Sequence, residues 1–367
     1  MGDSELSRRG MLAGLATLGV SSVAGCIGAP IGEDGRGEAT PTPSPNPLVE
    51  PSADPDARFN DIYEQTIDSV ALVRSFGFDG PRGQGSGFIF RDGYVLTNEH
   101  VVTRATEVEL QFRNNYWTEG TVVGDDPYSD LAVIEANDLP ERATPLDHAE
   151  YRATVGQEVL ALGNPFGLEE SVSQGIVSGR NRSLPTGTGF SIPATIQTDA
   201  SVNPGNSGGP LVTMNGAYLG VITARAGQDI GFAVSWRLSE RVGPELIEHG
   251  SYEHPYMGVT LMQVTPGIAE ANDLEEVSGV ILVDILPGDP ADGTLQGSTD
   301  ETTIRGLRVP VGGDVIVQLD GIAIETDEML STYLALNKRP GDLLDVTVIR
   351  DGERETVSFE LGERPPP

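Results

Sequence analysis

Short apolar runs alternate with Gly, Pro, Asn and Asp through most of the middle of this 367-residue chain, from residue 70 to residue 234. Strands of a partly buried sheet give such runs, because turn residues interrupt the chain wherever a strand must end. The pattern therefore predicts an all-β sandwich or barrel. Its predicted strands include residues 108–112, 121–123, 131–134, 159–162 and 218–223.

Apolar residues at helical spacing flank this β region on both sides. Phe59, Ile62 and Ile67 lie on one helical face, which predicts a short amphipathic helix before the first strand. Residues 236–249 should form a second helix that closes the region. Because proline cannot donate a backbone hydrogen bond, Pro244 is expected to bend or restart that helix.

A second unit begins near Tyr252. Residues 279–285 are expected to form a strand, 326–337 a helix and 341–361 a hairpin. Residues 293–311 are polar and rich in Gly and Thr, and we interpret them as a surface insertion. The two units together predict a mainly β protein.

Residues 205–210 read Gly-Asn-Ser-Gly-Gly-Pro and carry the strongest chemical signal. The glycines let the backbone turn sharply and direct amide groups toward one point, as the nucleophile of an acyl transfer requires. An ordinary tight turn is the alternative interpretation of this segment alone. Two further residues favour catalysis: His100 follows an apolar strand, and Asp130 immediately precedes another. The chain order His, Asp, Ser is that of chymotrypsin-type triads.

The chain contains four histidines. His148, His249 and His254 lie in polar surroundings without a matching strand corner, and we expect them to be solvated surface side chains. His100 is therefore the candidate general base.

Four motifs make the chain resemble the HtrA (DegP-like) serine proteases. They are Thr-Asn-Glu-His-Val at 97–101, Ser-Asp-Leu-Ala-Val at 129–133, Gly-Asn-Pro-Phe-Gly at 163–167 and Asn-Pro-Gly-Asn-Ser-Gly-Gly-Pro-Leu at 203–211. The resemblance covers residues 58–362. It implies a chymotrypsin-like double β-barrel followed by a PDZ domain, a small β barrel with helices. In that fold the triad lies between two six-stranded barrels.

The chemistry assigns a role to each residue of the trio. Ser207 should attack the peptide carbonyl, His100 should take its proton, and Asp130 should hold the imidazole and stabilise its charged form. The backbone N–H groups of Gly205 and Ser207, together with that of Asn206, are expected to form the oxyanion hole. Because the Asn206 side chain cannot pair with a newly formed N-terminus, we expect activation by loop rearrangement rather than by clipping.

Analogy with the family places the specificity pocket at Ser201, with walls at Thr223 and Gly227. No acid stands at Ser201, which argues against a preference for Lys or Arg. Small or medium aliphatic residues are the expected preference.

Tyr256-Met257-Gly258-Val259 resembles the carboxylate-binding loop of a PDZ domain. There Gly258 would turn backbone amides toward the terminal carboxylate of a peptide that adds as a strand. The alternative is a small β domain without affinity for peptides.

Acidic residues outnumber basic ones by 55 to 23, which gives a formal net charge of −32. Lys338 is the single lysine. Such a surface would repel nucleic acid and anionic lipid, so we expect no nucleic-acid partner. The composition resembles proteins of salt-adapted archaea. We therefore expect poor folding in low salt, where repulsion between carboxylates is weakly screened.

The first residues have the pattern of an export signal. Residues 7–12 contain a twin-arginine pair before an apolar run that is too short to span a bilayer comfortably. Val23-Ala24-Gly25-Cys26 resembles a lipobox, so Cys26 is the expected lipidation site; a stray buried cysteine is the alternative. Because Cys26 is the only cysteine, disulfides and thiol catalysis are excluded. The expected domains are 1–26 (signal peptide), 27–55 (Pro-rich tether), 56–250 (protease) and 252–362 (PDZ).

The sequence thus predicts an exported, lipid-anchored, ATP-independent serine endopeptidase that degrades misfolded extracytoplasmic proteins. Its expected partners are unfolded or C-terminal peptides, the membrane through Cys26, and copies of itself in a trimer or a multiple of one. No cofactor or metal is expected, since the chain has no His-Glu-x-x-His motif or cysteine cluster. A holdase chaperone or a peptide-binding scaffold with a dormant protease fold are the alternatives.

Overall fold

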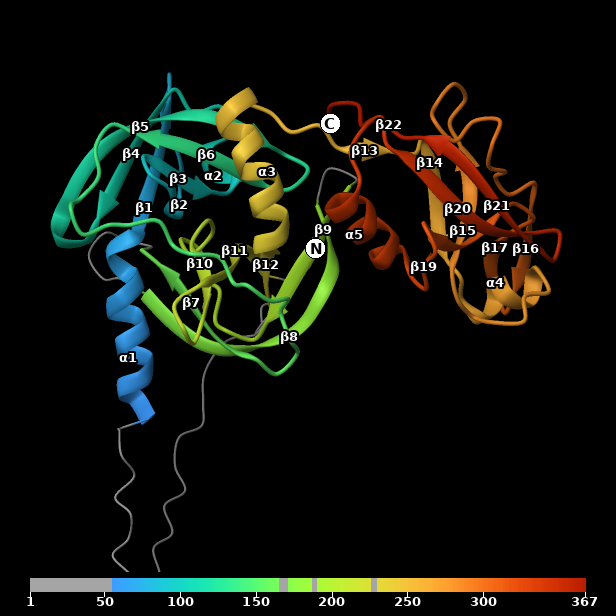
Figure 1. The fold of residues 1–367 in the computed structure, drawn as a ribbon, viewed down its shortest axis with the longest axis horizontal. Helices are drawn as coiled ribbons and strands as arrows, with labels where there is room; N and C mark the ends of the chain where they lie inside the picture. Colours follow the sequence, from blue (N-terminus) through green and yellow to red (C-terminus); the bar gives the residue numbers. More distant parts are fainter. Residues whose placement is uncertain (1–54, 165–170, 187–189, 226–229) are drawn as a thin grey trace, which may run out of the picture. The chain divides into compact units, whose positions relative to one another are not determined.

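The computed structural model describes residues 55–164, 171–186, 190–225 and 230–367 (Figure 1). Cys26, the export signal and almost all of the tether fall outside the described residues, as does Gly227. The described part belongs to one compact unit, Ala53–Pro367. None of its helices combines the length and apolar character needed to cross a bilayer.

The first barrel closes on itself in the strand order β1-β2-β3-β6-β5-β4. Apolar side chains of these strands fill it, and Val73, Ile89, Leu110 and Ile134 are completely buried there. Its elements are β1 Val70–Gly77, β2 Gly80–Arg91, β3 Tyr94–Thr97, α2 Glu99–Val102, β4 Glu107–Phe112, η2 Arg113–Asn115, β5 Tyr116–Asp126 and β6 Leu131–Ala136.

The second barrel closes in the order β10-β11-β12-β9-β8-β7. Val159, Leu211, Leu219 and Ala233 are completely buried in its interior. Its strands are β7 Glu158–Gly163, β8 Ser171–Pro185, β9 Ser191–Thr198, β10 Pro210–Thr213, β11 Tyr218–Arg225 and β12 Gly231–Ser235. The two barrels confirm the predicted chymotrypsin-like architecture.

A shared apolar core joins the barrels and the helices that flank them. Phe88 of the first barrel lies 5.0 Å from Tyr218 of the second, measured between ring centroids, and both are fully buried. Helix α1 (Pro55–Thr66) and the short η1 (Ile67–Ser69) precede β1, as the apolar spacing predicted. Helix α3 (Trp236–His249) continues through Pro244 as a single element, so the predicted restart does not occur.

The C-terminal unit is built on a sheet in the order β14-β15-β18-β20-β21, with β19 beside β18. Leu330 of α5 is buried against this sheet, and Met329, Tyr333 and Leu334 of the same helix pack beside it. The elements are β13 Pro255–Tyr256, β14 Val259–Gln263, α4 Pro266–Ala271, β15 Val280–Ile285, β18 Val315–Leu319, β19 Ile322–Ala323, α5 Asp327–Asn337, β20 Leu343–Arg350, β21 Glu353–Glu360 and β22 Gly362–Glu363.

The polar stretch 293–311 contains a hairpin of its own, β16 (Asp300–Ile304) with β17 (Leu307–Val311), which pairs with no strand of the main sheet. The main sheet resumes directly after it. Asp314 is fully buried there and accepts two hydrogen bonds of 2.7 Å from the Arg350 guanidinium. This pair holds the chain in place where the hairpin ends and the main sheet continues.

Candidate active site

The two barrel segments that carry His100 and Asp130 meet because of strand pairing. Strand β3 ends at Thr97, which pairs with Ala132 near the start of the antiparallel strand β6. The residues that follow β3 therefore lie beside those that precede β6. His100, in the short helix α2, and Asp130, immediately before β6, reach each other although 30 positions separate them.

Asp130 holds the imidazole with both carboxylate oxygens. His100 Nδ1 lies 2.9 Å from each of them, and the His100 backbone N–H donates to Oδ1 at 3.1 Å. With a carboxylate as the acceptor, Nδ1 carries the proton and Nε2 is left as the basic nitrogen. Asn98 Nδ2 donates to the Asp130 carbonyl at 2.8 Å and steadies the backbone.

Asp130 adopts a left-handed backbone conformation, with φ of 54°. Such values are sparsely populated for residues other than glycine, and they persist where the surroundings hold them in place. The turn before Asp130 is held by Asp126, which accepts from the backbone N–H groups of Tyr128 and Ser129 at 3.2 Å each. Asp126 also lies 2.8 Å from Nε2 of His254.

His254 is therefore not the solvated side chain that its polar sequence neighbours predicted. It is 7% exposed, and Tyr128 and Tyr252 pack edge-on against its ring. The prediction failed because the polarity of neighbouring residues does not show whether a linker packs against the rest of the protein. The linker between α3 and β13 packs against the turn that contains Asp126. His249 is exposed as predicted, and so is His148, although its ring stacks on Trp236 at 4.6 Å.

Opposing effects determine the proton affinity of His100. Burial alone lowers its pKa, but the hydrogen bond with Asp130 and the charges of Asp130 and Glu99 outweigh burial, so the pKa lies above its ordinary value of 6.5. Burial also raises the pKa of Glu99, which is only partly exposed. The imidazole is thus arranged to accept a proton readily.

Ser207 lies in the loop that leads into β10. Its carbonyl accepts from the Ser86 N–H at 2.7 Å, and its Oγ donates to the Thr223 carbonyl at 3.1 Å. Within the described residues, no hydrogen bond joins this hydroxyl to His100. Thr223 links the serine to the His–Asp pair. Its carbonyl accepts from Ser207 Oγ, and its hydroxyl donates to Asp130 Oδ2.

Two glycines allow the barrels to approach this closely. A Cβ on Gly208, whose φ is 86°, would lie 2.0 Å from the Ser86 carbonyl oxygen. A Cβ on Gly85 would lie 2.8 Å from the Ser207 carbonyl oxygen. Side chains at these positions would force the nucleophile loop away from the first barrel.

The predicted oxyanion-hole donors differ in their availability. The Asn206 N–H already donates to the Asn203 carbonyl at 3.0 Å, so it is occupied in this arrangement. The amides of Gly205 and Ser207 make no hydrogen bond within the described part of the chain. The Asn206 side chain is buried and accepts from Ser171 Oγ at 2.9 Å, which ties the nucleophile loop to the start of β8.

Among the predicted specificity residues, Ser201 is exposed and Thr223 is buried. The analogy with the family predicts Thr223 only as a pocket wall and does not predict its contact with Asp130. A signal was present, because Thr223 is a polar residue inside the apolar run of β11. Ser86, whose Oγ donates to the Gly205 carbonyl at 2.6 Å, was also missed, and nothing local in the sequence marks it.

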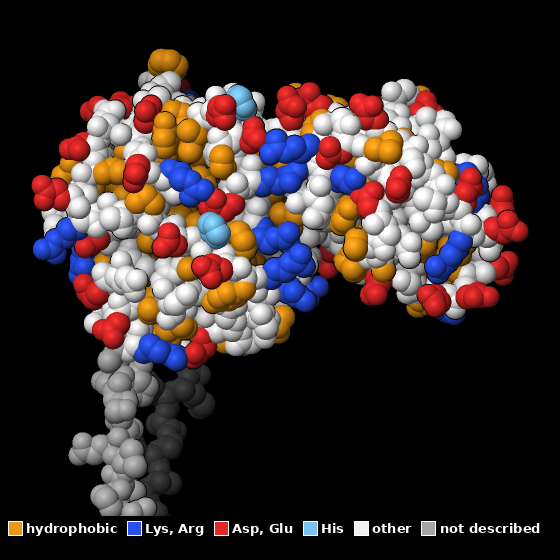
Figure 2. Space-filling model, in the orientation of Figure 1, with side chains coloured by type: hydrophobic (Ala, Val, Ile, Leu, Met, Phe, Trp, Pro, Cys, Tyr) orange, Lys and Arg blue, Asp and Glu red, His pale blue; other side chains and the backbone are white. Residues whose placement is uncertain are grey.

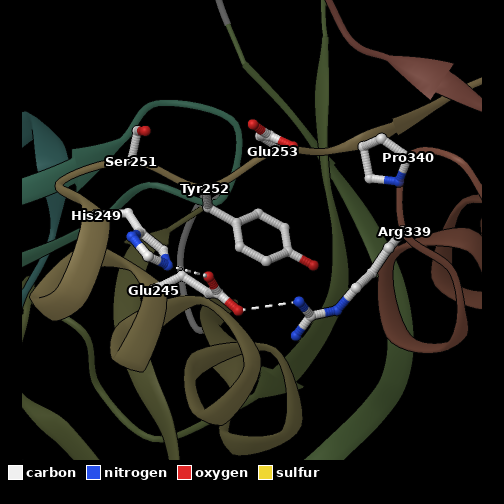
Figure 3. Close-up of a pocket in the computed structure, with 7 residues that line it drawn as sticks. All are labelled: Glu245, His249, Ser251, Tyr252, Glu253, Arg339 and Pro340. Atoms are coloured by element: carbon white, nitrogen blue, oxygen red, sulfur yellow. Dashed lines mark ion pairs between the residues drawn. The ribbon is translucent and has the colours of Figure 1, made fainter.

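Two surface pockets can be compared as substrate sites. One opens beside His100, has an empty volume of about 790 Å³ and is lined by residues 81–83, 100, 101, 103 and 104. The other is lined by residues of α3, of the segment after it and of the segment after α5 (Figure 3). In the second, Glu245 is shared between His249 at 3.6 Å and Arg339 at 3.0 Å. Only the first contains a predicted catalytic residue.

The predicted carboxylate-binding loop is held against the residues that follow β15. Tyr256 donates to Asp289 Oδ2 at 3.0 Å, and the Met257 side chain is buried in the core. Gly258 has φ of 77°, and a Cβ there would lie 2.2 Å from Cβ of Asp289. Because Met257 faces the core, any contribution of this residue to a bound peptide must come from its backbone.

Comparison with known families agrees with this geometry. Residues 85–221 match the trypsin-like peptidase domain, and residues 255–361 match the PDZ domain. The solved HtrA-type protease AlgW, determined with a tripeptide, is 31% identical to this chain, with a TM-score of 0.68. The match spans 84% of this chain and 98% of that one. The chain belongs to the HtrA family of serine proteases.

Other HtrA relatives agree with this placement. A serine endoprotease of Yersinia pestis superposes with a TM-score of 0.59 at 28% identity, over 84% of this chain and 98% of its own. A probable periplasmic DegP-like serine endoprotease of Pseudomonas fulva is 37% identical over 84% of this chain. The chain spans 62% of the length of that relative and 57% of a similarly named one from Halomonas elongata, which is 34% identical over 77% of this chain.

Proposed function

We propose that this HtrA protein is an extracytoplasmic serine endopeptidase with the triad His100, Asp130 and Ser207. The observation that carries the proposal is the contact of His100 Nδ1 with both oxygens of a buried carboxylate. It leaves Nε2 as the basic nitrogen of an imidazole whose pKa is raised.

The proposed reaction starts when Ser207 Oγ leaves the Thr223 carbonyl and donates to His100 Nε2. The serine oxygen then attacks the scissile carbonyl while its proton passes to Nε2, and the new charge on the substrate oxygen is stabilised by the amides of Gly205 and Ser207. Nε2 returns the proton to the leaving amine. Water then hydrolyses the acyl-enzyme by the same route.

The substrate and specificity are part of the proposal. Misfolded extracytoplasmic proteins are the proposed substrates, because the DegP-like relatives are named as periplasmic endoproteases. Backbone amides near Gly258 are proposed to bind peptide C-termini, which suits a family whose AlgW structure holds a tripeptide. Ser201, Thr223 and Gly227 are proposed to shape a pocket for small or medium aliphatic residues.

Degradation of casein tests the assignment of the nucleophile. We expect Ser207→Ala to abolish proteolysis, whereas Ser358→Ala, the same change on the outer strand β21, should leave it unchanged. Retained cleavage in Ser207→Ala would refute the proposed triad. Labelling by a fluorophosphonate, which reacts with activated serines, should disappear in the same variant.

One observation favours a second candidate, a holdase chaperone with a dormant catalytic centre. The Ser207 hydroxyl is bound to the Thr223 carbonyl and not to His100. Suppressed aggregation of an unfolded client, with no cleavage by either the native chain or Ser207→Ala, would favour the chaperone over the enzyme.

Export and anchoring are further proposals, supported by the sequence of residues 1–55. We propose twin-arginine export with a signal peptide over 1–26, lipid attachment at Cys26 and a Pro-rich tether over 27–55, followed by the protease domain over 56–250 and the PDZ domain over 252–362. Mass spectrometry of the membrane-fraction protein should show a lipidated Cys26. Release of Cys26→Ser into the soluble fraction would agree, and unchanged retention would refute the anchor.

Assembly and salt adaptation complete the proposal. We propose a homo-oligomer, a trimer or a multiple of one, to be checked by light scattering of the full chain. The net charge of −32 supports a protein of haloarchaeal type that folds best at high salt. A melting temperature that is unchanged between dilute buffer and molar KCl would refute that part.

A further inference from the structure

A pocket apart from the catalytic residues lies at the start of α3. The pocket is shallow: a water-sized sphere can be centred within only about 20 Å³ of it, and the empty volume of about 340 Å³ includes space open to solvent. Residues of β8, β9 and α3 and of the loop before β7 line it, and Leu336 of α5 closes one side. Figure 2 shows Lys and Arg side chains gathered on the surface between α3 and α5.

Three arginines, Arg152, Arg180 and Arg237, line this pocket. Within the described residues, none of their guanidinium groups makes an ion pair or a hydrogen bond. The lining residues in that part of the chain include no carboxylate. The protein has a formal charge of −32, so carboxylates are abundant. A pocket lined by three guanidinium groups without carboxylate partners is therefore unusual in it.

The pocket also contains the N-terminus of α3, a helix of 14 residues. Its N-cap, Ser235, makes no capping bond, and the first turn carries no acidic residue. Ser235 is buried, with an exposure of 8%, and its Oγ has no hydrogen-bond partner among the residues that the structure describes. Unpaired amides and partial positive charge at a helix start favour a bound anion.

The positive charges that line this pocket repel one another. Burial lowers the pKa of the Arg237 guanidinium, and the charge of Arg152 lowers it further. A bound anion would relieve the repulsion between these groups. A buried hydroxyl without a partner is likewise costly, and an acceptor oxygen would remove that cost.

We propose that the open mouth of this pocket binds a small tetrahedral oxyanion of the phosphate class. Arg152, Arg180 and Arg237 supply charged donors from three separate segments, and Ser235 with the first amides of α3 supplies the rest. Guanidinium groups bind the oxygens of carboxylates and phosphates alike, but three donor residues on separate segments can serve the four oxygens of a tetrahedral anion, whereas a carboxylate offers two. The site is independent of the catalytic residues, so its occupancy can be measured whether or not the protein cleaves peptides.

Fluorescence of Trp236 provides the test, because this residue lines the pocket and begins α3. The full chain contains two tryptophans, so Trp117→Phe leaves Trp236 as the only reporter. Inorganic phosphate is titrated at constant pH and constant ionic strength, with KCl as the balancing salt. We expect a saturable change, together with a phosphate-dependent rise in melting temperature. Sulfate and acetate titrations distinguish tetrahedral anions from carboxylates.

Matched variants decide whether the named residues form the site. Arg152→Gln and Arg237→Gln should each weaken phosphate binding by about tenfold, as expected for loss of a charge-assisted hydrogen bond. Ser235→Ala should weaken it by about threefold. Arg305→Gln removes the same charge from an exposed pair with Glu270 and should leave binding unchanged.

Four outcomes would overturn the proposal. One is a response to KCl equal to the response to phosphate in both fluorescence and melting temperature. Another is equal weakening by Arg305→Gln, which would reflect net charge alone. The third is full phosphate affinity in both Arg152→Gln and Arg237→Gln. Stronger binding of acetate than of phosphate would replace the oxyanion with a carboxylate and would also refute the assignment.

Discussion

Thr223→Val tests how the structure holds Asp130. The Thr223 hydroxyl donates to the carboxylate that holds His100, and both residues are largely buried, with exposures of 4% and 9%. Valine keeps the shape of the side chain but removes the donor. The Thr223 carbonyl, which accepts from Ser207 Oγ, is unchanged because it belongs to the backbone.

The size of the effect follows from the contacts of Asp130. A hydrogen bond to a charged group contributes about 1.5–3 kcal/mol. Since about 1.4 kcal/mol corresponds to a factor of ten, complete loss would lower kcat/KM by about tenfold to a hundredfold. Asp130 keeps its contacts with the ring and the backbone N–H of His100. We therefore expect a loss near tenfold.

The assay compares kcat/KM for peptide cleavage by the native chain, Thr223→Val and Thr223→Ser. Serine keeps the hydroxyl and should stay within about threefold of the native chain. Thermal unfolding of each variant separates loss of fold from loss of orientation. Equal impairment of the Val and Ser variants would assign the effect to the methyl group, and full activity of the Val variant would refute the role of the hydroxyl.

Two further predictions concern the same site. Catalysis needs neutral His100, so activity should fall as the pH drops through its raised pKa. Glu99→Gln removes one of the charges that raise this pKa. The variant should therefore move the acid limb of the kcat/KM profile to lower pH. A shift to higher pH would contradict this assignment. Gly208→Ala should destabilise the fold by at least about 1 kcal/mol and greatly reduce cleavage, because φ is positive and the new methyl would meet Ser86. Gly156→Ala has a similar φ in open space, so it measures the backbone strain alone; equal losses of activity in the two variants would disprove the steric explanation.

Much of the fold could be predicted because its signals are local. Alternation of apolar and turn residues marked the strands, and the helical spacing at Phe59, Ile62 and Ile67 marked α1. The continuity of α3 through Pro244 could not be predicted in this way. Burial of Leu238, Val242 and Leu246 against both barrels stabilises the helix on either side of the proline.

In the candidate site, too, local motifs predict the residues but not all of their contacts. His100, Asp130 and Ser207 could be nominated because each stands in a recognisable local motif. The buried partner of Asp126, His254, could not be found that way, since 128 positions separate the pair. The bond from Ser207 Oγ to the Thr223 carbonyl could not be predicted either, because it depends on how the loop that bears Ser207 packs against β11.

The sequence by itself determined which residue types stand at strand ends and tight turns, and therefore which side chains are available for chemistry. The tertiary structure decided which of them meet: Thr223 with Asp130, His254 with Asp126, and three arginines with the start of α3. The physical reason is the separation along the chain over which each kind of interaction acts. Backbone preferences act over a few residues, whereas burial and hydrogen bonding act between any groups that folding brings into contact.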